Sequence, residues 1–292
     1  MSTTVNTPTT PGTPHTPPNS PSHSLPIRRA TVSALIGKAV KDRTQVTGVA
    51  SFYMILIGAI LGLLWPPLRD VFRSMPASMN DLVKAISGGT DLSTPSGWAN
   101  AELLSLLAPA AVIVVAVMSA AAASAGEEEN KTLGLTLGAA VTRSTFLIAT
   151  MIAMFCSVLI VSIGIGVGLE LGNIIGNLGL SAAGISGVAA HALLLGTVFG
   201  TFAFLLGAAT GSKRVATLVP ALAAVLAFAA NTFLPLNSSL AGGQKFSPWY
   251  YYISDNPLVH GADGAHLLLL TGVSVVLAAA AVIVFRRRDL RG

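Results

Sequence analysis

Charged residues are scarce in this sequence. Only 10% of its 292 residues are Asp, Glu, Lys or Arg, whereas 52% are hydrophobic. The mean hydropathy is +0.72. A soluble globular domain carries about 25% charged residues, which keep its surface in contact with water. The shortage therefore excludes an ordinary soluble protein and indicates that most of the surface faces lipid.

Cysteine is almost absent, and the few cations are not clustered. A single cysteine, Cys156, excludes a disulfide within the chain, and its place in an apolar run favours a buried apolar role over redox chemistry. The pI of 9.7 does not indicate nucleic-acid binding, because the basic residues flank apolar runs and form no basic stripe. We expect the lipid bilayer, and no nucleic acid, as the partner of this surface.

Motifs for catalysis are also missing. The sequence has no G-x-x-x-x-G-K-[ST] to bind phosphate and no H-E-x-x-H. The positions of His191, His260 and His266 do not give metal-ligand spacing. The chain is therefore not expected to be an enzyme, and we expect it to bind no metal and no cofactor.

Long apolar runs are present instead, each near the roughly 20 residues that cross a membrane core about 30 Å thick. The sequence predicts an all-α integral membrane protein with six transmembrane helices. The runs are Val46–Leu64, Leu103–Ala123, Thr145–Gly168, Val188–Ala209, Val215–Leu234 and Ala265–Phe285, and none contains Asp, Glu, Lys or Arg. They are rich in glycine, with Gly58 and Gly62 four residues apart and Gly164 and Gly168 repeating the spacing, a pattern that favours close helix packing.

Two segments precede the runs. Residues 1–26 are rich in Pro, Thr and Ser and lack charge, which predicts a disordered tail. Residues 27–45 combine apolar positions spaced by three and four with five cations, which predicts an amphipathic helix on the membrane surface. A charged extension of the first transmembrane helix is the alternative. Residues 46–290 form the predicted six-span domain.

The cations set the predicted orientation. With six spans, both termini lie on one side, and that side collects 13 of the 17 Lys and Arg residues. Positive residues accumulate in cytoplasmic segments, so we expect both termini in the cytoplasm and the chain in the plasma membrane as a multi-pass protein. On the other side we expect a long loop from Trp65 to Glu102, broken by Pro66 and Pro67. The cluster Trp249–Tyr252 is expected as an aromatic belt at the lipid headgroups.

Two groups of residues are functional candidates. The segment Ala125–Arg143, AGEEENKTLGLTLGAAVTR, joins the second and third spans on the cytoplasmic side. It is either a solvated loop leading into a helix or a docking element for a soluble partner. Polar residues inside spans form the second group, although Asn and Thr often only join helices. These are His191, Asn231, Thr197 and Thr201.

The same segments resemble a known family. GEEE-x-x-TL-x-x-x-L followed by Arg143 resembles a conserved stretch of ABC-2-type ABC transporter permeases. Gly88–Pro109, Phe246–Gly264 and Phe285–Leu290 are similar to further parts of that family in the same order. Asn130-Lys131 and Ala140-Val141-Thr142 depart from the family pattern, so the local geometry of the cytoplasmic segment is expected to differ.

The resemblance implies a permease subunit of an ABC exporter that moves an amphiphilic or hydrophobic substrate. It implies two separate cytoplasmic ATPase subunits that bind ATP and Mg²⁺, and a second permease chain, identical or not. Residues 27–45 would match the family's interfacial elbow helix. The resemblance also places the contact with the ATPase in the cytoplasmic segment, with candidates Glu127, Glu128, Glu129, Thr132, Leu133 and Arg143.

Two other functions remain as alternatives. An ATP-independent secondary transporter usually carries ionisable residues in its spans, and the predicted spans have no Asp or Glu. A membrane anchor without transport activity, which recruits a cytoplasmic partner, would not need the long outer loops.

Overall fold

The computed structural model describes residues 43–76, 91–126 and 142–287, together with Gly37, Lys41 and Met79. Six helices in these residues are long and apolar enough to cross a membrane, which confirms the predicted number and order. The described parts of the chain contain helices and no strand. The predicted tail at residues 1–26 lies outside the described residues, as does nearly all of the predicted surface helix at residues 27–45. The six helices are Thr44–Phe72, Pro95–Ser124, Ser144–Gly176, Ala182–Thr210, Lys213–Leu236 and Gly264–Arg287.

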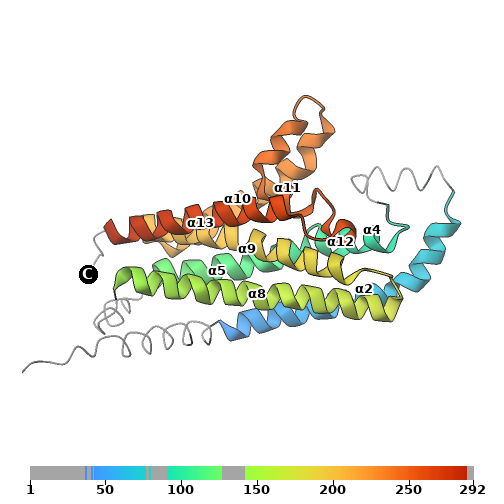
Figure 1. Ribbon diagram of the computed structural model, residues 1–292, viewed down its shortest axis with the longest axis horizontal. Helices are drawn as coiled ribbons and strands as arrows, with labels where there is room; N and C mark the ends of the chain where they lie inside the picture. The colour runs from blue at the N-terminus through green and yellow to red at the C-terminus, as the bar shows by residue number, and fades with distance from the viewer. Residues whose placement is uncertain are drawn as a thin grey trace, which may run out of the picture.

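The first span, α2 (Thr44–Ser74), continues through Pro66 and Pro67, so the prediction of a loop from Trp65 was wrong. Proline removes the N–H that would bond the carbonyl four residues earlier, which weakens a helix but does not forbid it. Packing against the bundle stabilises the helical conformation of residues 65–74. Trp65 is buried, and the ring centroids of Phe72 and Trp98 lie 6.3 Å apart. In Figure 1 the end of α2 bends away from the bundle, as prolines in a helix cause.

The second span consists of four short helical pieces. They are α4 (Pro95–Ala99), the π-helix η1 (Asn100–Leu104), α5 (Leu107–Ala121) and the π-helix η2 (Ala122–Gly126). The Thr94 hydroxyl accepts a hydrogen bond from the backbone N–H of Gly97 and so caps the first piece. A π turn inserts an extra residue into each end of the span, a feature found often at functional positions.

The third span, α8 (Arg143–Gly176), packs along α2 with almost no side chain between the two backbones. Three glycines of α8 meet two glycines of α2 along the contact. A Cβ atom built on any of them would overlap the backbone of the other helix. The glycine spacing read from the sequence therefore corresponds to a real contact. These residues are Gly58, Gly62, Gly168, Gly172 and Gly176, and we call the contact the glycine seam.

The fourth span, α9 (Ala182–Thr210), lies at the centre and contacts α5, α8, α10 and α13 (Figure 1). The Ser181 hydroxyl caps its first turn by accepting from the N–H of Gly184. Gly211 follows its last residue and caps its C-terminus, with a φ of 64° that is readily available only to glycine. Its central place explains why most of this span is buried within the protein.

The fifth span, α10 (Lys213–Phe233), leads into two 3₁₀ turns, η3 (Leu234–Leu236) and η4 (Ala241–Phe246). Residues 234–246 project sideways from the bundle as the orange hairpin of Figure 1, and we call them the lateral arm. The chain returns through α11 (Pro248–Ile253) and α12 (Pro257–His260) into the last span, α13 (Gly264–Arg287).

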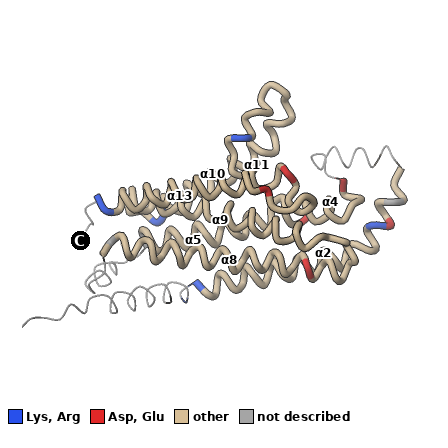
Figure 2. Tube along the Cα trace, in the orientation of Figure 1, with Lys and Arg blue, Asp and Glu red and all other residues tan. Residues whose placement is uncertain are grey.

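The two ends of the bundle differ in charge (Figure 2). One end holds the starts of α2 and α10 and the end of α13, and we call it the basic end. The residues at these helix ends are Arg43, Lys213 and Arg287. All Asp and Glu residues in the described parts of the chain lie toward the opposite end, which we call the acidic end. They are Asp70, Asp91, Glu102, Glu170, Asp255 and Asp263. The first three spans, as the structure has them, include Asp70, Glu102 and Glu170, so the prediction that the spans lack acidic residues holds only for the shorter predicted runs.

Candidate functional site

The predicted docking segment lies mostly outside the described residues. Of its candidates, Glu127, Glu128, Glu129, Thr132 and Leu133 are not described, and Arg143 is placed only as the first residue of α8. Both flanks of the segment are at the basic end: η2 ends at Gly126, and the Thr142 hydroxyl caps α8 by accepting from the N–H of Thr145. The role of these residues stays a prediction.

Side chains at the basic end join the span that precedes this segment to two other spans, α2 and α9. The Arg43 guanidinium donates a hydrogen bond to the backbone carbonyl of Ser119, 3.0 Å away, and so links the start of α2 to the end of α5. Ser124 packs against Gly207 of α9, where a Cβ would overlap its hydroxyl. η2 and α9 are therefore in direct contact at this position.

Two of the four polar candidates inside the spans bond to their own helix. Thr197 donates to the carbonyl of Leu193 at 2.7 Å, and Thr201 donates to that of Thr197 at 2.9 Å. This is the ordinary satisfaction of a hydroxyl in an apolar helix, and it gives neither side chain a ligand to hold. Asn231 is half-buried near the far end of α10, on a different helix from the other three. The four candidates therefore do not form one site.

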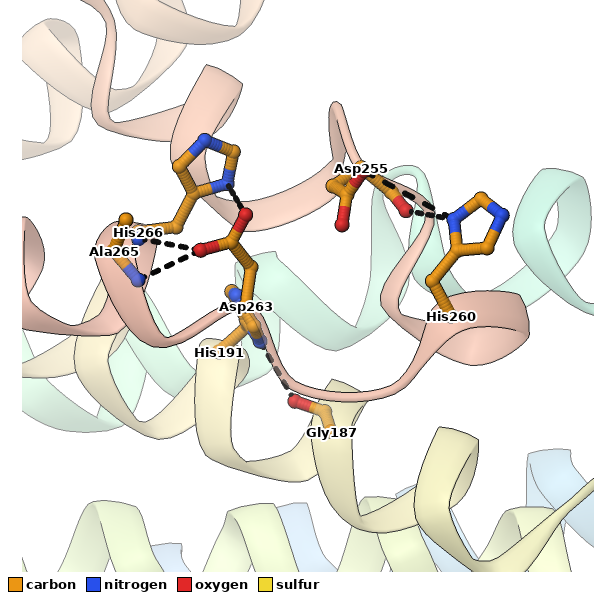
Figure 3. A network of polar contacts seen from close by, with 7 residues as sticks. All are labelled: Gly187, His191, Asp255, His260, Asp263, Ala265 and His266. Atoms are coloured by element: carbon orange, nitrogen blue, oxygen red, sulfur yellow. Dashed lines mark hydrogen bonds and ion pairs between the residues drawn. The ribbon is translucent and has the colours of Figure 1, made fainter.

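His191 differs from the other candidates because it is completely buried and only half satisfied. Its Nδ1 donates to the carbonyl oxygen of Gly187, 2.8 Å away on the same helix (Figure 3). Its Nε2 has no hydrogen-bond partner among the described residues. A buried acceptor without a donor costs about 1–3 kcal/mol of folding free energy. The histidine ring therefore destabilises the fold at this position.

The loop above His191 is organised by Asp263 (Figure 3). Its Oδ1 accepts hydrogen bonds from the backbone N–H groups of Ala265 at 2.7 Å and His266 at 3.0 Å, which caps α13. The bond from His266 is the main cause that lowers the pKa of Asp263 below its ordinary value. Nearby, the His260 ring donates to the carbonyl of Asp255 at 2.6 Å. These contacts hold the acidic end together.

Two of the four clustered aromatics hold the acidic end together from inside, so the prediction of a headgroup belt was wrong for Trp249 and Tyr252. Both are buried, and the Tyr252 hydroxyl donates to the carbonyl of Leu104, 2.9 Å away in η1. Burial raises the pKa of Tyr252. The ring of Trp249 lies 5.3 Å from that of Phe228. Sequence alone gave no sign of this, because the partners lie as far as 148 positions away.

A second buried polar contact at the acidic end was also not predicted from the sequence. The Asn100 amide donates to the side-chain oxygen of Asn256 at 2.9 Å, across 156 positions of the chain. Asn256 has a φ of 46°, in the left-handed region that Asn tolerates better than most residues. An Asn before a proline was the one available signal of a turn at this position.

The described part of the chain has no group of three or more His, Cys, Asp or Glu side chains that could hold a metal ion. No curated protein sequence matches the chain. One protein family does match, over residues 39–286: the C-terminal domain of the multidrug efflux system permease Rv1217c. That match spans the six helices of the described residues that are long and apolar enough to cross a membrane. The chain therefore belongs to this family of multidrug efflux permeases and is a multi-pass membrane transport protein.

Proposed function

We propose that the chain is the transmembrane subunit of an ABC-2-type exporter, driven by ATP hydrolysis in separate cytoplasmic ATPase subunits. The observation that carries the proposal is the match of an efflux permease family across all six spans. The sequence has no phosphate-binding loop, so the energy of ATP must come from a partner. A second permease chain completes the transporter.

The charge distribution supports an orientation with the basic end in the cytoplasm. The described acidic residues lie toward the other end, and cations mark the starts of α2 and α10 and the end of α13. Positive residues collect on the cytoplasmic side of membrane proteins. The first and last described helices, α2 and α13, both reach the basic end, which supports the proposal that both termini lie in the cytoplasm of a plasma-membrane protein.

The segment between η2 and α8 is then the contact with the ATPase. Its described flanks, η2 and α8, both lie at the basic end, and both pack on α9. Glu127, Glu128 and Glu129 would pair with cations of the ATPase and set the register of docking. Thr132, Leu133 and Arg143 would complete the contact. Movement of the ATPases would then reach the central helix through η2 and α8.

The test is co-purification of the ATPase subunit with a double charge reversal, Glu127→Lys with Glu128→Lys. We expect at least tenfold less ATPase bound, since like charges across an interface cost several kcal/mol and tenfold corresponds to about 1.4 kcal/mol. The matched control reverses two exposed acids at the other end, Asp70→Lys with Glu102→Lys, and should bind normally.

Two results would contradict parts of the proposal. Undiminished ATPase binding by the Glu127 and Glu128 variant would remove the docking segment. Substrate export from vesicles that contain this chain but no ATPase subunit would remove the ATP-driven mechanism and favour a secondary transporter.

A further inference from the structure

The central helix α9 carries a buried histidine that other parts of the chain cover (Figure 3). His191 is 0% exposed and lies one turn after Gly187. A Cβ on Gly187 would lie 2.7 Å from the backbone nitrogen of Ala262, and one on Gly184 would overlap the carbonyl oxygen of Leu258. The turns of α9 that lead to His191 therefore lie directly against the backbone of this segment. We call residues 257–263 the cover loop.

The hydrogen bond to Gly187 fixes the neutral form of the His191 ring. A backbone carbonyl can only accept, so the proton is on Nδ1 and Nε2 carries a lone pair. Nε2 finds neither a donor nor an acceptor among the described residues. An apolar side chain would fill the same space without leaving a polar atom unsatisfied. Packing alone therefore does not account for a histidine at this position.

A proton on Nε2 would make this arrangement less favourable still. The ring would then carry a charge and a second N–H donor. No acceptor in the described part of the chain lies within hydrogen-bonding distance of Nε2, and the ring is closed off from water. Burying a charge without a partner costs much more free energy than burying a neutral polar group. A protonated ring must therefore reach water or a carboxylate, which requires the cover loop to move away from α9.

Both carboxylates near His191 are already engaged by other groups. The Oδ1 of Asp263 accepts two backbone N–H groups, and its Oδ2 lies 3.8 Å from the Nδ1 of His266. The Asp255 carboxylate lies 4.0 Å from the Nδ1 of His260. A new charge on His191 therefore has no prepared partner while the cover loop is closed. The ionisable groups within electrostatic range of His191 are Asp255, Asp263 and His266.

The other elements that pack on α9 bring no further charge to the ring in the described residues. His191 is itself the only ionisable residue of α9, and α5 and η2 contain none. Tyr252 of α11 bonds to the carbonyl of Leu104. Glu170 of α8 is exposed, and the cations of α8, α10 and α13 lie at the basic end. A proton on His191 therefore acts chiefly on the cover loop.

We propose that His191 is a proton-operated lock: its neutral ring lets the cover loop close on α9, and protonation of Nε2 releases the loop. The lock involves one chain and needs neither ATP nor a substrate. Under the orientation proposed above the cover loop faces the outside of the cell, so external acid loosens this end of the bundle. Only that last consequence rests on the proposed function.

The test is amide hydrogen exchange of the full-length chain in lipid nanodiscs, followed by mass spectrometry at pH 7.5 and pH 5.5 and corrected for the intrinsic pH dependence of exchange. The N–H groups of Val259, His260 and Gly261 bond only within one turn, to the carbonyls of Asn256 and Pro257, and a single turn is not stable on its own. Their exchange therefore reports release of the cover loop. We expect it to be about tenfold faster at pH 5.5, because histidine gains its proton in this interval.

Two matched variants assign the response to one ring. His191→Asn keeps an amide that can donate to the carbonyl of Gly187 but does not titrate, so its exchange should be the same at both pH values. His260→Asn makes the same change at an exposed histidine of α12 and should keep the tenfold response. Asp263 does not contribute here, because the N–H bond from His266 lowers the pKa of its carboxyl further below this interval.

Three outcomes would overturn the proposal. The first is equal exchange of the cover loop at both pH values in the unchanged chain. The second is an undiminished response in His191→Asn, which would place the sensor in the pair of Asp263 and His266. The third is loss of the response in His260→Asn.

A second measurement needs no variant and decides the matter if His191→Asn does not fold. Deuterium exchange at the imidazole C2 position, followed by mass spectrometry, reports the access of each histidine ring to water. In the unchanged chain we expect His191 to exchange at least about tenfold more slowly than the exposed His260 at pH 7.5, and this difference should disappear at pH 5.5. Equal protection of His191 at both pH values would overturn the lock. Neither measurement uses ATP or an ATPase, so such a result would leave the proposed export function untouched.

Discussion

The glycine seam between α2 and α8 gives a sharp prediction, because one helix supplies both the test position and its control. A Cβ on Gly168 would lie 2.5 Å from the backbone oxygen of Met54 and 3.0 Å from the Cα of Ile55. Backbone atoms cannot rotate away, so Gly168→Ala must push the two helices apart. A Cβ on Gly166 would lie 3.7 Å from the Cβ of Ala189, an ordinary van der Waals contact.

The magnitude follows from comparing the two alanine variants. Each gains about 1 kcal/mol of helix propensity over glycine, and this gain cancels in the comparison. Only Gly168→Ala overfills its site, and overpacking a close contact costs about 1–3 kcal/mol. We therefore expect Gly168→Ala to be about 1–3 kcal/mol less stable than Gly166→Ala. At about 2–4 °C for each kcal/mol, the gap in Tm is about 2–12 °C.

The assay is thermal unfolding of both variants in the same detergent, followed by the loss of the monodisperse peak in size-exclusion chromatography. Gly62→Ala, on the opposite side of the seam, should resemble Gly168→Ala, because its Cβ would overlap the backbone of Gly172. Equal Tm values for Gly166→Ala and Gly168→Ala would refute the backbone contact. Such a result would mean that side chains or lipid separate α2 from α8.

The remaining predictions concern the acidic end. Tyr252→Phe should lower the free energy of unfolding by about 1–3 kcal/mol, since it leaves the buried carbonyl of Leu104 without its donor. Tyr251→Phe is the control because Tyr251 is only half-buried, and equal Tm values for the two variants would argue against the bond. Asp263 has a lowered pKa in the folded protein. Its negative charge therefore stabilises the fold at pH values above the ordinary aspartate pKa of about 4. This stabilisation is lost as the pH falls through the pKa of the folded state. Tm measured from pH 7 down to pH 3 should fall less steeply for Asp263→Asn than for the unchanged chain, and parallel curves would exclude Asp263 as a source of the pH dependence.

The sequence predicted the number and order of the spans because run length and the absence of charge depend only on local composition. It underestimated α2, since Pro66 and Pro67 weaken a helix locally while the burial of Trp65 stabilises it from outside the segment. The same limit applies to Tyr252, whose hydroxyl bonds to a residue 148 positions away.

The functional site could be predicted only in part. The docking segment is predicted from its acidic run and family resemblance, and it stays a prediction because residues 127–141 lie outside the described structure. His191 was singled out as a polar residue in a span, but only the structure shows that one of its ring nitrogens is unpaired among the described residues.

The distance between the charged residues along the helices of the glycine seam can be compared with the thickness of a bilayer. Glu170 follows Arg143 by 27 residues on α8, and at 1.5 Å per residue this is about 40 Å. On α2, Arg69 follows Arg43 by 26 residues, but its last residues lie past the bend at Pro66 and Pro67, so the straight part of α2 is shorter. A bilayer is about 40–45 Å thick including its headgroups. The seam holds the backbones of the two helices in contact, so we expect the pair to tilt as one unit. In a thinner membrane both helices must tilt together to keep their apolar surfaces within the bilayer. The bilayer thickness therefore influences the tilt of this permease in the membrane.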